Sequence, residues 1–288
     1  MPAPATFRSP SLTASAMLAP AMLLIVFYLI LPSLTLLRYS FDAYDPILLL
    51  KGTFTLENYA SFFKQPYYQD VLLTTVLISV GCTVGSLVLG VPAAYSLART
   101  RSRFKSLYMI ITIFPLFMGN VVRSEGWIAA FGTRGFVNVI LMDAGLIDHP
   151  VKLMYTTFAV VVGTLSVVLP IMILILQGVF ESVDYSLVDA ARNLGAGYFA
   201  AARGVLLPMV LPGMTVGSVF VFILCMNAYA TPFLLGGPGF RMMAPVLYRQ
   251  IATNSDWPMG SSIAFILMAV TILATAISIR LLAQKKRS

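Results

Sequence analysis

Long apolar runs separated by short polar segments dominate the pattern of this chain. None of the runs contains Asp, Glu, Lys, Arg or His, and most are close to the roughly 20 residues that a helix needs to cross about 30 Å of hydrocarbon. The pattern predicts an all-α integral membrane protein. Its six expected membrane-spanning helices cover residues 17–37, 71–98, 106–122, 153–177, 206–226 and 258–279.

Three of these segments are irregular. Pro20 and Pro32 should bend the first run or mark its ends, because proline removes a backbone donor. This run is too long for the core of a signal peptide and shows no convincing cleavage site, so we expect a retained helix. The third run is short and is interrupted by Pro115. After it, the amphipathic segment 135–146 predicts a short helix along the membrane surface.

Composition supports the membrane assignment, since 59% of the residues are hydrophobic and 10% are charged. The net charge of +8 could indicate nucleic acid, but the basic residues flank the apolar runs and form no continuous face. We therefore expect contact with membrane lipid and none with nucleic acid.

The flanking charges predict an orientation. Six crossings place both termini on one side, together with the turn at residues 99–105 and the polar segment 181–205. That side carries 11 of the 19 Lys and Arg residues but 3 of the 11 acidic residues. Positive charge accumulates on the cytoplasmic side of membrane proteins. The termini and the segment 181–205 are therefore predicted to be cytoplasmic.

Motifs for covalent chemistry are missing from the sequence. No Gly-Lys pair exists, which excludes a P-loop, and the single histidine, His149, excludes a Ser/His/Asp triad. Cys82 and Cys225 lie in apolar runs without further metal ligands, so we interpret them as small apolar side chains. The sequence predicts neither an enzyme nor a metal site. Any ATP and Mg²⁺ would have to be bound by a partner chain.

The polar segment 181–205 contains the signals of a short helix. Ser186 is a suitable N-cap, and Asp189 three residues later would complete a capping box. Ala190 and Ala191 favour helix, and Gly195 is a natural place for it to end. Ala191 and Gly195 are four residues apart, so one face would be almost free of side chains and open to close approach by another surface.

This segment resembles the cytoplasmic Glu-Ala-Ala loop of ABC-type importer permeases. The matching pattern is Asp189-Ala190-Ala191, three residues, Gly195, nine residues, and then residues 205–208. Asp189 stands where Glu is usual. The resemblance implies a type I importer fold and a coupling helix seated in an ATPase groove, with Leu187 and Leu194 at the contact. The alternative is an amphipathic interfacial helix whose spacing matches by chance.

The apolar runs contain no ionisable residue near the middle of the membrane, where ion-coupled carriers usually place one. This argues against a secondary carrier, although that class and a membrane scaffold stay open as alternatives. The candidate residues for a substrate path are polar or aromatic: Asn227, Tyr229, Thr231, Glu125 and Trp127. Hydrogen bonding between helices is the competing interpretation for several of them.

Further similarity narrows the resemblance to the spermidine/putrescine permease group. The segments that carry it are residues 55–59, 92–95 and 231–238, with Arg123, Trp127, Gly135 and Asn138. Members often carry a polar or acidic residue shortly before the Thr-Pro pair, where this chain has Ala228 and Tyr229. The substrate could therefore be a polyamine or another solute, such as an opine-like compound, a phosphonate or a metal complex.

This resemblance implies a bacterial inner-membrane subunit with several partners. These are two ATPase subunits, a second related permease, expected to form a heterodimer with this one, and a substrate-binding protein outside the membrane. The expected organisation has three parts. They are residues 1–70 with the tail, first helix and outer loop, residues 71–282 with the permease core, and the basic tail 283–288.

Overall fold

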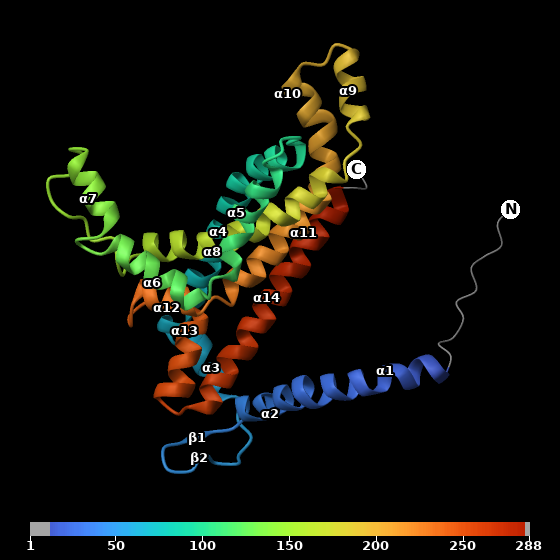
Figure 1. The fold of residues 1–288 in the computed structure, drawn as a ribbon. Coiled ribbons are helices and arrows are strands. Elements are labelled where there is room, and N and C mark those ends of the chain that lie inside the picture. The colour runs from blue at the N-terminus through green and yellow to red at the C-terminus, as the bar shows by residue number, and fades with distance from the viewer. Residues whose placement is uncertain (1–11, 286–288) are drawn as a thin grey trace.

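The computed structural model describes residues 12–285 of the 288-residue chain. Four long helices form its bundle (Figure 1), namely α4 (Pro66–Arg99), α8 (Thr157–Glu181), α11 (Leu207–Met226) and α14 (Trp257–Lys285). α8 packs against both α4 and α11, and α11 also contacts α14. Val160, Val168 and Met172 of α8 are almost fully buried at these contacts. The centre of the bundle is therefore α8.

Close helix packing depends on glycine at the crossing of α8 and α11. A Cβ atom at Gly213 would lie 2.7 Å from Cγ1 of Val179 and nearer still to its Cγ2. On α4, a Cβ atom at Gly90 would lie 3.0 Å from Cγ of Met172. Small residues let membrane helices approach each other when lipid provides no hydrophobic driving force between them. Gly90 is such a contact point, whereas a Cβ atom at Gly81 of the same helix would meet no atom within 4 Å.

The N-terminal helix lies largely outside this bundle. α1 (Leu12–Ile25), the π-helical turn η1 (Val26–Ile30) and α2 (Leu31–Ser40) follow one another without a break, and in Figure 1 they project away from the bundle. α2 contacts α14, where the Ser262 hydroxyl donates to the Ser40 carbonyl at 3.0 Å. The side chains described between residues 18 and 34 are all exposed. These residues have no partner within the described chain, so lipid or another protein must cover them.

The third apolar run does not form the single helix expected over residues 106–122. α5 (Lys105–Phe117) ends early, and the next helical segment starts at Asn120 at an angle of 98° to it. Pro115 weakens the last turn of α5, and the Arg123 guanidinium donates to the carbonyls of Pro115 and Met118. The chain turns here because a side chain satisfies the carbonyl groups that the broken helix leaves free.

Two shorter helices follow this bend. α6 (Asn120–Phe131) packs on α12 (Ala230–Gly236), and α7 (Phe136–Asp143) confirms the short helix expected within residues 135–146. Asn138 holds the loop after α7, since its side-chain amide donates to the Val151 carbonyl and its oxygen accepts from the Val151 amide. The side chain is fully buried. The Asn138 side chain thus satisfies the Val151 backbone groups, which a neighbouring strand would bond in a sheet.

Short elements cover the end of the bundle where α2 ends and α14 begins. They are the antiparallel hairpin of β1 (Tyr44–Asp45) and β2 (Leu49–Leu50), followed by α3 (Glu57–Lys64), α13 (Met243–Tyr248) and η3 (Arg249–Thr253). A second apolar cluster joins them to the long helices. Its fully buried members include Phe62, Met226, Met243 and Ile263.

Within the described residues, five helices are long and apolar enough to cross a membrane, or six if the bent third segment counts as one span. The fifth begins well before residue 206, because α10 (Tyr198–Ala201) and the π-helical turn η2 (Ala202–Leu206) lead directly into α11. Part of the predicted loop 181–205 is therefore helix. α14 continues to Lys285, and residues 1–11 and 286–288 of the expected tails lie outside the described residues.

The close contact at Gly213 can be tested by adding one methyl group to this residue. Gly213→Ala should lower the free energy of unfolding by about 1–3 kcal/mol, because the added carbon overlaps with Val179. Thermal unfolding of the purified protein in detergent measures the change. Gly178→Ala in α8 is the matched control, since a Cβ atom there meets no atom within 4 Å. Equal stability of the two variants would contradict the packing argument.

Candidate coupling and substrate-path sites

The helix expected within residues 181–205 is present as α9 (Ser186–Asn193). Figure 1 shows α9 and α10 projecting from the end of the bundle at which α14 ends. The helix has no buried residue, and Leu187 and Leu194 are 51% and 90% exposed. Asp189 and Ala190 are exposed as well. The residues expected to contact a partner therefore lie together on a projecting, uncovered element.

The capping box predicted at the start of α9 is wrong. Tyr185 occupies the N-cap position and makes no side-chain cap bond. Asp184 replaces the predicted Ser186 cap, because its carboxylate accepts from the Ser186 amide at 3.0 Å. Hydrogen bonds from the Ser186 side chain and backbone lower the pKa of Asp184. An acidic side chain also suits the positive end of a helix, so the helix is capped by a related mechanism from two residues earlier.

Gly195 ends the helix in a Schellman motif. Its φ is +94°, its amide donates to the Arg192 carbonyl at 3.0 Å, and the Ala196 amide donates to the Ala191 carbonyl at 3.1 Å. The prediction that Gly195 shares the helical face of Ala191 is wrong, because Gly195 lies beyond the last helical residue. A Cβ atom at Gly195 would meet nothing within 4 Å in this chain. Only backbone strain and an external partner would disfavour a side chain here.

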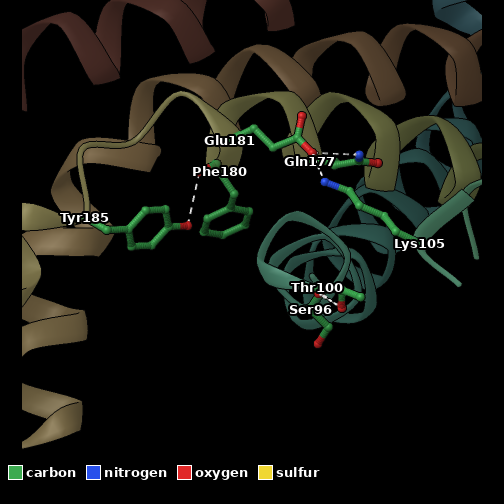
Figure 2. A network of polar contacts seen from close by, with 7 residues as sticks. All are labelled: Ser96, Thr100, Lys105, Gln177, Phe180, Glu181 and Tyr185. Carbon is green, nitrogen blue, oxygen red and sulfur yellow. Dashed lines mark hydrogen bonds and ion pairs between the residues drawn. The ribbon is translucent and has the colours of Figure 1, made fainter. Parts of the chain in front are cut away.

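The base of this projection is connected to the turn between α4 and α5 (Figure 2). The Lys105 ammonium lies 2.9 Å from the Glu181 carboxylate, which also accepts from Gln177 at 3.1 Å. Tyr185 donates to the Phe180 carbonyl at 3.1 Å. None of these residues was expected to form a site from the sequence. The signal in the sequence for this ion pair was that Lys105 stands at the start of one apolar run and Glu181 after the end of another.

The expected path residues separate into two environments around α11. Asn227 donates to the Ile223 carbonyl at 2.9 Å and lines a groove of about 490 Å³ between α11 and α14. Tyr229 instead belongs to an aromatic cluster, with its ring centroid 5.4 Å from that of Phe233 and 4.8 Å from that of Tyr248. Phe233 and Tyr248 are 38% and 46% exposed. We call these three rings the aromatic cluster.

The remaining path candidates contact α8 or solvent. The Trp127 indole donates to the Ser166 hydroxyl at 3.0 Å, and buried Thr231 packs against Gly163 one turn away. Both arrangements favour the alternative of contacts between helices. Glu125 is exposed on α6. Among the described residues no group of three or more His, Cys, Asp or Glu side chains could hold a metal ion.

Comparison with known proteins identifies the family. Residues 86–288 match the family described as binding-protein-dependent transport system inner membrane component. The chain belongs to this family. As a permease subunit of an ABC importer it is not itself catalytic and carries no cofactor. The alternatives of an ion-coupled carrier and a scaffold are therefore wrong. The permease is a multi-pass protein of the bacterial inner membrane, and its family implies ATPase subunits and a binding protein.

Individual relatives support the same assignment. The permease is 29% identical over 251 residues to the spermidine/putrescine transport system permease protein PotB of Haemophilus influenzae. The alignment covers 86% of this chain and 87% of that protein. It is 31% identical over 246 residues to PotB of Salmonella typhimurium, covering 85% of each. A bacterial alginate ABC transporter bound to its periplasmic protein matches with a TM-score of 0.77 at 15% identity, over 92% of each chain. This last similarity confirms the type I importer fold.

The role of the projecting helix can be tested at its end. Gly195→Trp should abolish uptake while the amount of permease in the membrane stays the same. The indole would fill the open space at Gly195 and keep a partner protein from contacting the helix end. Uptake per amount of membrane-inserted permease measures the effect. Gly195→Asn is the control for strain, since Asn tolerates the left-handed backbone, and it should retain more uptake than the Trp variant. Normal uptake by the Trp variant would contradict a partner contact at this position.

Proposed function

We propose that this permease subunit imports polyamines such as spermidine and putrescine, or closely related small amines, in an ATP-driven transporter. The observation that carries the substrate class is the similarity to spermidine/putrescine permeases along about 85% of the chain. The aromatic cluster supports it. An ammonium group is attracted to the face of an aromatic ring, and Phe233 and Tyr248 have exposed surfaces at the end of α11.

The assembly that we propose has four further chains. Two ATPase subunits bind ATP and Mg²⁺, a second related permease completes the path as a heterodimer, and a substrate-binding protein delivers the amine. The permease core, residues 71–282, forms the path with its partner. The segment 1–70 adds the N-terminal helix, whose exposed side chains fit a cover of lipid or partner permease. The tail 283–288 adds positive charge to the cytoplasmic side.

Force reaches the permease through α9 in this mechanism. The residues that contact the ATPase groove are Leu187, Asp189, Ala190, Ala191, Leu194 and Gly195. ATP binding brings the two ATPase subunits together and moves α9 with them. α9 is short and closed by the Schellman motif at Gly195, so it transmits the displacement as a rigid element. The excess of Lys and Arg on the same side as α9 supports a cytoplasmic position for it and for both termini.

The substrate follows the aromatic cluster and the polar groups near it. Tyr229 contributes the central ring, and Asn227, Thr231, Trp127 and Glu125 are the nearby groups proposed for the path. No buried carboxylate accompanies the cluster among the described residues, since the buried acid Asp42 binds the amides of its own loop. Selectivity then resides mainly in the binding protein, and the permease offers weak, ring-based contacts. Weak contacts suit a path because the substrate must also leave.

Uptake assays decide the substrate. Cells that lack other polyamine uptake systems should import radiolabelled spermidine only when this permease and its ATPase subunits are present. Unlabelled putrescine should compete, and octopine or methylphosphonate should not. Uptake of labelled octopine or labelled methylphosphonate, without uptake of spermidine, would replace the polyamine proposal by one of the other solutes.

The aromatic cluster gives a second prediction. Tyr229→Ala should lower spermidine uptake at low concentration about tenfold, because a cation–ring contact contributes about 0.5–2 kcal/mol. Tyr229→Phe keeps the ring and should retain nearly normal uptake. Initial rates over a range of spermidine concentrations measure both variants. A Phe variant as impaired as the Ala variant would indicate that the hydroxyl, and not the ring, is required.

A further inference from the structure

Two side-chain contacts connect the start of the projecting segment to the turn between α4 and α5. One is the ion pair of Lys105, the first residue of α5, with Glu181, the last residue of α8. In the other, the guanidinium carbon of Arg99 lies 4.3 Å from the centroid of the Tyr185 ring. Arg99 is the last residue of α4, and Tyr185 directly precedes α9. We call these four residues the clasp.

The position of the ion pair cannot be explained by the stability of its own helices. Lys105 lies at the N-terminus of α5 and Glu181 at the C-terminus of α8, and each charge has the unfavourable sign for the helix dipole there. Gln177 donates to the same Glu181 oxygen and holds the carboxylate toward Lys105. The two charges therefore stabilise the contact between α5 and α8, although each charge is unfavourable for the dipole of its own helix.

The contact between Arg99 and Tyr185 is also held in place by the C-terminal end of α8. The Tyr185 hydroxyl donates to the Phe180 carbonyl, which keeps the ring beside the last turn of α8 and under Arg99. The Phe180 ring in turn contacts Tyr95 of α4 edge to face, with centroids 5.5 Å apart. On the other chain segment, Thr100 closes α4 through its amide and hydroxyl bonds to the Ser96 carbonyl. Both sides of the clasp are thus fixed.

We infer that the clasp transmits the motion of α9 to α4 and α5, so that Lys105, Glu181, Arg99 and Tyr185 are positioning residues for coupling. Without it, the motion of α9 would reach α4 and α5 only indirectly, through their packing against α8 and α11. With it, the same displacement reaches α5 and, through the bend at Arg123, reaches α6. Because α6 packs on α12, the route ends beside the aromatic cluster. This inference rests on the proposed function, in which ATP moves α9.

Charge reversal tests the ion pair in the assembled transporter, reconstituted in liposomes with its ATPase subunits, second permease and binding protein. Lys105→Glu should lower the number of spermidine molecules imported per ATP hydrolysed about fivefold, while basal ATP hydrolysis continues. Lys105→Arg should leave this ratio nearly unchanged. The double variant Lys105→Glu with Glu181→Lys should recover it.

These variants separate coupling from stability. Glutamate at residue 105 and lysine at residue 181 both have the favourable sign for their helix dipoles, so a loss in Lys105→Glu cannot be assigned to a weaker α5. For the second contact, Tyr185→Phe keeps the ring under Arg99 and should retain more of the ratio than Tyr185→Ala. A normal ratio in Lys105→Glu, or no recovery in the double variant, would overturn the role of the ion pair.

A measurement without substrate distinguishes the clasp from the choice of polyamine. Spin labels are attached in the assembled transporter at Ser102 in the turn and at Ser186 in α9, which are both exposed. The native cysteines Cys82 and Cys225 are replaced by alanine so that they take up no label. In the unaltered clasp the distance between the labels should stay the same with and without ATP, and in Lys105→Glu it should change or broaden on ATP binding. A change in the unaltered clasp would overturn the inference. Failure of spermidine uptake with an unchanged distance would overturn only the substrate.

Discussion

Backbone amides and carbonyls have no water to bond inside a bilayer, and the whole architecture follows from this constraint. The chain meets it with long helices, whose groups pair internally. At two of the places where the described chain leaves helical geometry, side chains replace the missing partners. The Arg123 guanidinium does so at the end of α5, and the Asn138 amide does so after α7. The bend that aims α6 toward α12 exists because one arginine supports it.

A second consequence concerns the way such a bundle can be moved. α8 is in contact with α4 and α11 through glycines and buried aliphatic side chains, and such packing transmits displacement well because it leaves little free space. The projecting α9 has no buried residue, and it contacts the neighbouring α10 and η2. It is therefore suited to receive a force from another protein, while the closely packed helices below it are suited to redistribute that force.

The aromatic cluster shows how a permease can contact a cation without a buried charge. A carboxylate in hydrocarbon would be costly to desolvate and would hold a polyamine tightly, whereas ring faces attract an ammonium group at much lower desolvation cost. Tyr229 and Phe233 lie one turn apart at the start of α12, and Tyr248 is the last residue of α13. In the proposed path the permease passes on a substrate that is selected elsewhere, and a fold by itself does not determine a substrate.

The sequence by itself determined the class of the molecule, its apolar segments and the short helix α9, because these depend on local composition and spacing. Runs of uncharged residues encode membrane helices, and Gly195 encodes a helix end through its freedom to adopt positive φ. The tertiary structure alone decided the bend after Phe117, the cap from Asp184, the aromatic cluster and the pairing of Lys105 with Glu181. Each of these depends on the direction of a side chain or on the meeting of residues far apart in the chain, as with the 76 positions between Lys105 and Glu181. Hydrophobic periodicity contains no information about such meetings, since it specifies which segments are helices and leaves open which helix ends lie side by side.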